Sequence, residues 1–193
     1  MTVKTSSYLP AASWITEAEE DWTQLAGFGP AGLPGYVRVR ILPDPERPFQ
    51  SENDVTPSPE ALGDGEQMRL VVQILAAHTG TPEEAFFCLW DGWDTPIPGF
   101  KPMVRIPHRA YYLFEGPLRE VGQWQLPATS QTPESDLVPA FVWPADRAWC
   151  VAKDVDQHWI GVGAGEAALQ DLLAEPRLDV VKADPAEQQP FYL

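Results

Sequence analysis

Hydrophobic and polar positions alternate along several short stretches of this chain, a pattern typical of β-strands. Residues 36–42 are the clearest case, because Val37, Val39 and Ile41 share one side of the stretch and two arginines share the other. Short apolar or aromatic runs bounded by turn-forming residues predict further strands at 86–90, 104–106, 110–115, 141–143, 149–152, 159–162 and 178–182. The pattern therefore predicts a chain built around a sheet.

Helical spacing recurs in three places. Apolar residues repeat at intervals of three and four in 66–77 and in 163–174, which predicts two amphipathic helices. A third helix is expected to begin at Thr16, because Thr16 and Glu19 have the spacing of a capping box, and to end at Gly27.

Three stretches have neither pattern and are expected to be irregular. Residues 43–65 are rich in proline and acidic residues, residues 120–137 are polar, and the acidic tail 183–193 is expected to fray. The strands come in neighbouring groups with the helices set apart. This order predicts an α+β fold with a largely antiparallel sheet of about five to seven strands and two or three helices packed on one face.

The length of the chain bounds the number of domains. With 193 residues, of which 44% are hydrophobic, the chain can enclose one core, so residues 1–193 are expected to form a single domain. Only Cys88 and Cys150 are present, each among apolar neighbours. They are expected to be buried reduced thiols, as in a cytoplasmic protein, with a disulfide between them as the alternative.

The chain is strongly acidic. It has 28 Asp and Glu against 13 Lys and Arg, a formal net charge of −15, and the basic residues are spread singly, so nucleic acid is not an expected partner. No apolar run approaches the roughly 20 residues that span a bilayer. The first ten residues also lack the apolar segment of a secretion signal, so the chain is expected in the cytoplasm and away from membranes.

Tryptophan is concentrated in residues 143–165, where three indoles lie among polar and charged residues, and two more flank a turn at 90–93. Exposed tryptophan is enriched at interfaces, so we predict accessible indoles that form a recognition surface; the alternative is that they seal a small core. Asp146 and Arg147 are either a recognition pair beside an indole or a tight turn with a local ion pair. The predicted binding residues are Trp90, Trp93, Arg109, Trp143, Asp146, Arg147, Trp149 and Trp159.

Candidate catalytic chemistry is sparse. Asp154, Asp156 and His158 alternate, and on an extended strand their side chains would share one side and suit a divalent metal. A polar turn in which the aspartates accept from backbone N–H groups is the favoured interpretation. Cys150 with His108 or His158 is the remaining nucleophile and base combination, and an inert buried thiol is favoured over it. No metal and no cofactor are therefore expected.

Three sequence blocks carry a resemblance to a known family. The block W-P-A-D-R-A-W-C-V-A-K-D-V-D at 143–156, followed by W-I-G-V-G, resembles the C-terminal signature of a family of uncharacterised actinobacterial proteins. The blocks F-F-C-L-W-D-G-W at 86–93 and P-H-R-A-Y-Y-L-F-E-G-P-L at 107–118 are similar to the middle of those proteins. The resemblance covers about the last half of the chain and implies no established activity. The acidity and tryptophan content are also similar to those of bacterial toxin-immunity proteins.

These observations predict an acidic, non-catalytic binding module. Its expected partner is a protein, with a basic one favoured because acidity speeds encounter with a cationic surface. An immunity-type role against a basic toxin is the most concrete version. The alternative is a small-molecule or metal-dependent enzyme built around His108, His158, Asp154 and Asp156.

Overall fold

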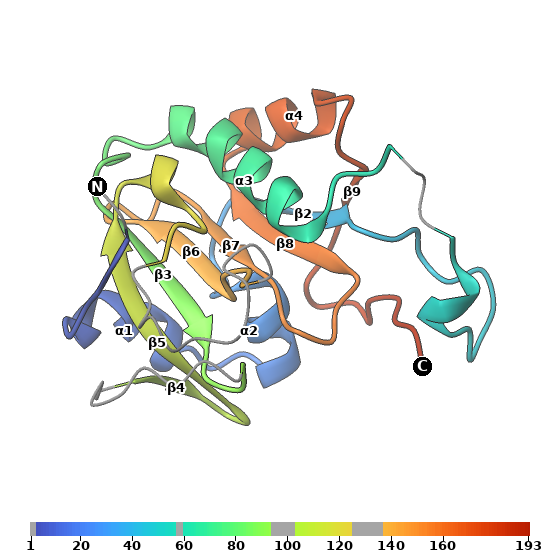
Figure 1. Cartoon of the computed structure of the whole chain (residues 1–193), viewed down its shortest axis with the longest axis horizontal. Helices are drawn as coiled ribbons and strands as arrows, with labels where there is room; N and C mark the ends of the chain where they lie inside the picture. Colours follow the sequence, from blue (N-terminus) through green and yellow to red (C-terminus); the bar gives the residue numbers. More distant parts are fainter. Residues whose placement is uncertain (1–2, 57–59, 94–102, 125–136) are drawn as a thin grey trace.

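The computed structural model describes residues 3–56, 60–93, 103–124 and 137–193 (Figure 1). Within these ranges the strands are β1 Lys4–Thr5, β2 Gly35–Arg40, β3 Ala85–Trp90, β4 Val104–Ile106, β5 Arg109–Gly116, β6 Phe141–Pro144, β7 Cys150–Ala152, β8 Trp159–Ala164 and β9 Val180–Lys182. The α-helices are α1 Ser13–Thr16, α2 Trp22–Phe28, α3 Asp64–Leu75 and α4 Glu166–Ala174. Short 3₁₀ turns are η1 Leu9–Ala12, η2 Glu52–Asp54, η3 Ala76–His78 and η4 Leu118–Glu120.

The strands form one antiparallel sheet. Its order is β1-β5-β3-β6-β7-β8-β2-β9, and β4 pairs with β5 as well. The α+β class and the antiparallel sheet are thus confirmed, and the nine strands of the described residues exceed the expected five to seven. The sheet is larger in part because a run of only two residues, β1, for which the sequence pattern gave no signal, pairs with the long strand β5.

Helices cover both faces of the sheet (Figure 1), so the expectation that they pack on one face is wrong. Side chains alternate along β3: Phe87 belongs to the core cluster that includes α3 and α4, whereas Cys88 belongs to a second cluster that includes Leu25 of α2. Because both sides of the central strands are apolar, each side needs its own cover.

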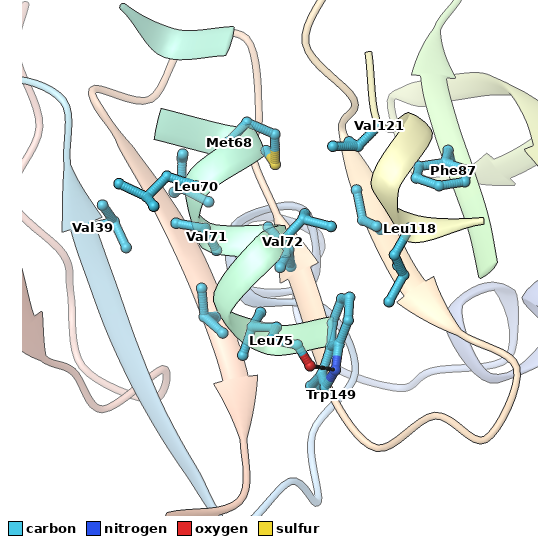
Figure 2. Close-up of a cluster of buried hydrophobic side chains, with 14 of the residues drawn as sticks. Val39, Met68, Leu70, Val71, Val72, Leu75, Phe87, Leu118, Val121 and Trp149 are labelled. Atoms are coloured by element: carbon cyan, nitrogen blue, oxygen red, sulfur yellow. Dashed lines mark hydrogen bonds between the residues drawn. The ribbon is translucent and has the colours of Figure 1, made fainter. Parts of the chain in front are cut away.

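Helix α3 shows how the first of these cores is assembled. Met68, Val71, Val72 and Leu75 are buried on the face of α3 that lies over the sheet (Figure 2). Such spacing gives a helix one apolar stripe, and burying the stripe stabilises the helix more than its intrinsic propensity does. The expected helix at 66–77 is confirmed with shifted bounds: the α-helix begins at Asp64 and ends at Leu75, and the chain continues in the 3₁₀ turn η3.

The segment before β2 forms two short helices rather than the single helix expected from Thr16. Asp21 caps α2, because its carboxylate accepts from the Thr23 N–H at 2.9 Å, whereas Thr16 ends α1. The capping box at Thr16 is therefore not formed, because the helix that carries Leu25 begins after Asp21, and Asp21 provides its cap. Helix α2 lies close against β8, and a Cβ atom added at Gly161 would be 2.0 Å from the Gly27 carbonyl oxygen.

Two segments expected to be irregular meet at one edge of the molecule. The tail 183–193 has no helix or strand, yet the Tyr192 hydroxyl donates to the Pro43 carbonyl at 2.5 Å and the Leu193 N–H donates to the Gln50 carbonyl at 3.0 Å. Figure 1 shows the C-terminal end on the same side as the 43–56 segment. Most of the third irregular stretch, 120–137, lies outside the described residues. In the part of the chain that the structure covers, none of the helices has the length and apolar character to cross a membrane.

Candidate functional site

Three of the tryptophans predicted to bind a partner lie inside the protein. Trp143, Trp149 and Trp159 are 1%, 0% and 3% exposed. Trp149 also donates its indole N–H to the Leu75 carbonyl at 2.9 Å, at the end of α3 (Figure 2). The expectation that the indoles form an accessible surface is wrong for these three residues, because Trp149 and Trp143 fill the cores on the two faces of the sheet and Trp159 packs against Phe28 of α2.

Trp90 and Trp93 are half-buried and lie in contact at the end of β3. Their ring centroids are 6.0 Å apart in an edge-to-face arrangement. The Arg109 guanidinium lies over the Trp90 ring at 5.7 Å and over the Trp22 ring at 5.4 Å. Two predicted binding residues, Trp90 and Arg109, are therefore neighbours, and Trp22 joins them from α2.

Arg109 is fully engaged within the protein. Its Nε and Nη2 donate to the two carboxylate oxygens of Asp154, each at 2.8 Å, and Nη2 also donates to Asp156 at 3.0 Å. The Arg109 side chain is 14% exposed and that of Asp154 is 9% exposed. Such bidentate pairs are strong and fix geometry. This assembly ties β5 to the turn between β7 and β8, and it leaves Arg109 little capacity for a partner.

The three candidate metal ligands point to different places. Asp154 and Asp156 accept from Arg109, whereas the His158 ring lies 3.2 Å from the Asp44 carboxylate. The three side chains diverge because residues 155–156 form a turn. The alternating side-chain directions of an extended strand therefore do not apply to this segment. Among the described residues no group of three His, Cys, Asp or Glu side chains is placed to hold a metal ion.

The candidate nucleophile is deep in the core. Cys150 is a free, buried thiol, and burial raises its pKa, so it is a poor nucleophile at neutral pH. His108 lies on the exposed turn between β4 and β5, where it has a positive φ of 65° and its ring meets Trp22 at 5.1 Å. His158 is buried against Asp44 and Tyr192. These contacts assemble no nucleophile and base pair.

Asp146 and Arg147 lie in a turn, and their side chains contact different parts of the protein instead of each other. The Asp146 carboxylate accepts from the Gly80 N–H at 2.7 Å and from the Thr79 hydroxyl at 2.8 Å, so it holds the loop before β3. Arg147 has a positive φ of 55°, and its guanidinium lies 5.3 Å from the Trp14 ring. The contacts of Asp146 are those of the turn interpretation.

The exposed aromatic surface is elsewhere. Among the described residues the large hydrophobic side chains that are exposed are Tyr8, Phe49, Phe191 and Leu193, and Phe49 is the most exposed, at 85%. Three of them line one groove of about 510 Å³, which we call the aromatic groove. It is formed by residues 45–49 and by residues 188–191 with Leu193.

A buried ion pair fixes one wall of the aromatic groove. The two Nη atoms of Arg38 donate to the two oxygens of Asp44 at 2.6 and 3.1 Å, and the Arg38 side chain is only 7% exposed. Burial alone would raise the pKa of Asp44, but hydrogen bonds from Arg38 and His158 outweigh it and lower that pKa to about 2. The position of Asp44, five residues before Phe49, is thus set by the sheet.

The other wall of the aromatic groove, formed by residues of the tail, is held by contacts with His158 and Pro43. The Tyr192 ring packs edge-to-face on His158, with ring centroids 4.8 Å apart, and its hydroxyl donates to the Pro43 carbonyl. Burial lowers the pKa of His158, so the ring that Tyr192 meets is neutral at pH 7. Phe191, beside Tyr192, is therefore placed opposite the 45–49 segment.

Acidic side chains surround the aromatic groove. Glu46 lines it, Glu187 is exposed directly before its second wall, and Arg47 is paired with Asp54 at 2.9 Å. Both partners of this pair are exposed, so it offsets the charge of Arg47 only in part, and together with Glu46 and Glu187 the border of the groove carries a net negative charge. An apolar surface with a charged border is typical of a docking site.

Sequence patterns did not reveal this groove, since both of its walls were taken as irregular stretches. A weak signal was present in Phe49 and Phe191, two aromatic residues in segments that otherwise lack large apolar side chains. Comparison of the chain with protein-family models, with curated proteins and with solved structures found no match.

Proposed function

We propose that this protein is a non-catalytic binding module that docks a basic, apolar segment of a protein partner in the aromatic groove. The observation that carries the proposal is Phe49, 85% exposed and held beside Phe191 within acidic surroundings. A monomeric protein gains nothing from leaving such a ring in water, whereas a partner that covers it gains the hydrophobic contribution.

The expected contribution of the two rings is substantial. Fully burying a phenylalanine side chain contributes about 1.5–3 kcal/mol, and two such anchors offset part of the cost of association. The anchors Phe49 and Phe191 also come from segments that are tied to the sheet through Asp44 and Tyr192. Because their backbone is already positioned, little ordering has to occur on binding.

Charge selects the kind of partner. The net charge of −15 attracts cationic surfaces over a long range, and Glu46 and Glu187 border the groove. A basic toxin neutralised in an immunity-type complex is the concrete form of the proposal. We place this role in the cytoplasm, a location supported by the free state of Cys88 and Cys150.

The proposal is tested with matched peptides on an array. Each pair of twelve-residue peptides shares the same leucine and phenylalanine positions, and one member carries lysine and arginine where the other carries glutamate. We expect the full chain to bind basic members only, with binding that weakens as salt rises. The variant with Phe49→Ser and Phe191→Ser should lose this binding.

The control variant is Tyr8→Ser, which removes an exposed aromatic ring outside the groove and should leave binding unchanged. Equal binding to acidic and basic members would contradict the proposed partner. Binding that survives loss of both phenylalanines would place the docking surface elsewhere, and self-association through the groove, seen by analytical ultracentrifugation, would replace the partner by a second copy of the chain.

A further inference from the structure

A second cavity, of about 370 Å³, lies directly beside the aromatic groove. It is enclosed by α2, by the turn that leads into β8, and by the tail. The stretch 188–191 lines both hollows, so Phe191 is a wall of each. A segment docked in the groove would therefore pass the mouth of this cavity, and one of its side chains could enter.

The charged groups of the cavity lining are acidic. Asp156, whose side chain is 81% exposed, and Glu187 line it, and no lysine or arginine does so among the described residues. Two arginines lie close to the lining and both are paired within the protein: Arg109 donates to Asp156 at 3.0 Å, and Arg38, 5.6 Å from the Trp159 ring, donates to both oxygens of Asp44. Glu187 therefore carries most of the negative charge that the lining offers to a ligand. His158 adds no charge at pH 7, because burial lowers its pKa. A cation is therefore the charged ligand that the cavity suits.

The uncharged part of the lining favours a flat cation over a compact one. Phe191, which is 57% exposed, is the accessible aromatic wall, and Phe28 and Trp159, only 1% and 3% exposed, form the base beneath it with ring centroids 4.9 Å apart. The side-chain amides of Gln24 and Gln188 supply further oxygen acceptors. A guanidinium stacks on aromatic rings and carries five donors in one plane, whereas an ammonium is a point charge that holds its water more strongly.

We infer that this cavity receives an arginine side chain of the basic partner. The inference rests on the proposed function and deepens it, because it names the residue that the docked segment must carry beside its apolar anchors. The partner's arginine would bind in the cavity while its apolar side chains bind in the aromatic groove, on the two sides of Phe191. A lysine at the same position would still pair with the carboxylates. It would form fewer hydrogen bonds with the amide oxygens and would not stack on the aromatic ring.

The test uses N-acetyl-argininamide as the probe and the full, isotope-labelled chain. Amide resonances of Glu187, Phe191 and Trp159 are followed by NMR as the probe is added. We expect saturable shifts at these residues, weaker binding of N-acetyl-lysinamide, and no binding of the citrulline analogue, which has the same shape without the charge. Glu187→Gln should weaken the arginine probe about two- to fivefold, the range for a solvent-exposed ion pair.

Glu84→Gln is the matched control, an exposed carboxylate far in the sequence from every residue of the cavity lining, and it should leave probe binding unchanged. Equal binding of the citrulline analogue, equal binding of the lysine probe, or shifts that Glu187→Gln does not alter would overturn the inference. The absence of any shift at high probe concentration would overturn it as well.

The two proposals fail in different ways. If basic apolar peptides bind and need the two groove phenylalanines but ignore the arginine probe, the docking function stands and the arginine cavity does not. If the arginine probe binds while no peptide does, the cavity stands as a guanidinium site and the docking function falls.

Discussion

The buried pair between Arg38 and Asp44 should be a main determinant of stability at the edge that carries the aromatic groove. Asp44→Asn keeps the size of the side chain and removes its charge. The Arg38 guanidinium would then remain 7% exposed without a counter-ion, and His158 would lose a carboxylate neighbour. An uncompensated buried charge is among the most destabilising single changes in a protein.

The loss of stability caused by Asp44→Asn can be estimated in two ways. Breaking a buried ion pair costs about 3–5 kcal/mol, and Asp44 is 24% exposed, so water screens part of this loss. The pKa of Asp44, lowered from 3.8 to about 2, corresponds to about 2.5 kcal/mol, since a tenfold change in proton affinity is worth about 1.4 kcal/mol. We expect Asp44→Asn to lower the free energy of unfolding at pH 7 by about 2–3 kcal/mol.

The loss should depend on pH in a defined direction. The pKa of Asp44 is lower in the folded protein than in the unfolded chain, so its stabilisation is fully present above pH 4 and is lost as the pH falls through the folded value of about 2. The difference between the native chain and Asp44→Asn should therefore shrink between pH 4 and pH 2. Urea unfolding followed by tryptophan fluorescence measures both quantities.

Asp179→Asn is the control for this experiment. Asp179 pairs with Arg40 at 2.8 Å but is 50% exposed, so its removal should cost less than about 1 kcal/mol. The reasoning would be refuted if the two variants lost the same stability, or if the deficit of Asp44→Asn were as large at pH 2 as at pH 7.

Three further outcomes test the account of the fold. Arg109→Ala leaves Asp154 buried without its partner and should cost about 3 kcal/mol in urea unfolding, against less than about 0.5 kcal/mol for the exposed Arg105→Ala; equal losses would contradict the pairing. Gly161→Ala places a Cβ atom 2.0 Å from a backbone oxygen of α2 and should lower the melting temperature by several degrees, whereas Gly80→Ala, with its nearest contact at 3.5 Å, should have little effect. The two buried thiols have raised pKa values and should react with a thiol reagent at pH 8 only after unfolding, so rapid labelling of the native protein would refute their burial.

The strands could be predicted because their side-chain period is local. Val37 and Val39 alternate with arginines in the sequence, and in β2 the two valines are 0% exposed on one face. The arginine side of such an alternating strand usually meets solvent, yet Arg38 is buried there against Asp44. That contact depends on the path of residues 41–44, and the hydrophobic periodicity of the sequence does not predict this path.

Two-sided burial of the sheet had a signal in the sequence. β3 and β6 read as continuous apolar runs, A-F-F-C-L-W and F-V-W-P, and continuous runs are typical of strands covered on both faces. The same fact explains the buried tryptophans. Trp143 lies within such a run, so both faces of its strand are enclosed and its indole fills a core.

The aromatic groove could not be predicted, because its two walls are about 140 residues apart in the sequence. The contacts that bring them together, between Tyr192 and Pro43 and between His158 and Asp44, follow no spacing rule. For Asp154, Asp156 and His158 the sequence favoured a turn over a metal site, and residues 155–156 do form a turn. The aspartates accept from Arg109, a distant partner that the spacing could not reveal.

The most direct measurement of the central claim is NMR shift mapping of the full chain with the tightest-binding basic peptide from the array. We expect the largest shifts at 45–49 and 187–193, with Phe49 and Phe191 among them, and small shifts at Trp90 and Trp93. The largest shifts at the Trp90–Trp93 turn, or shifts spread evenly over the acidic surface, would contradict docking in the aromatic groove.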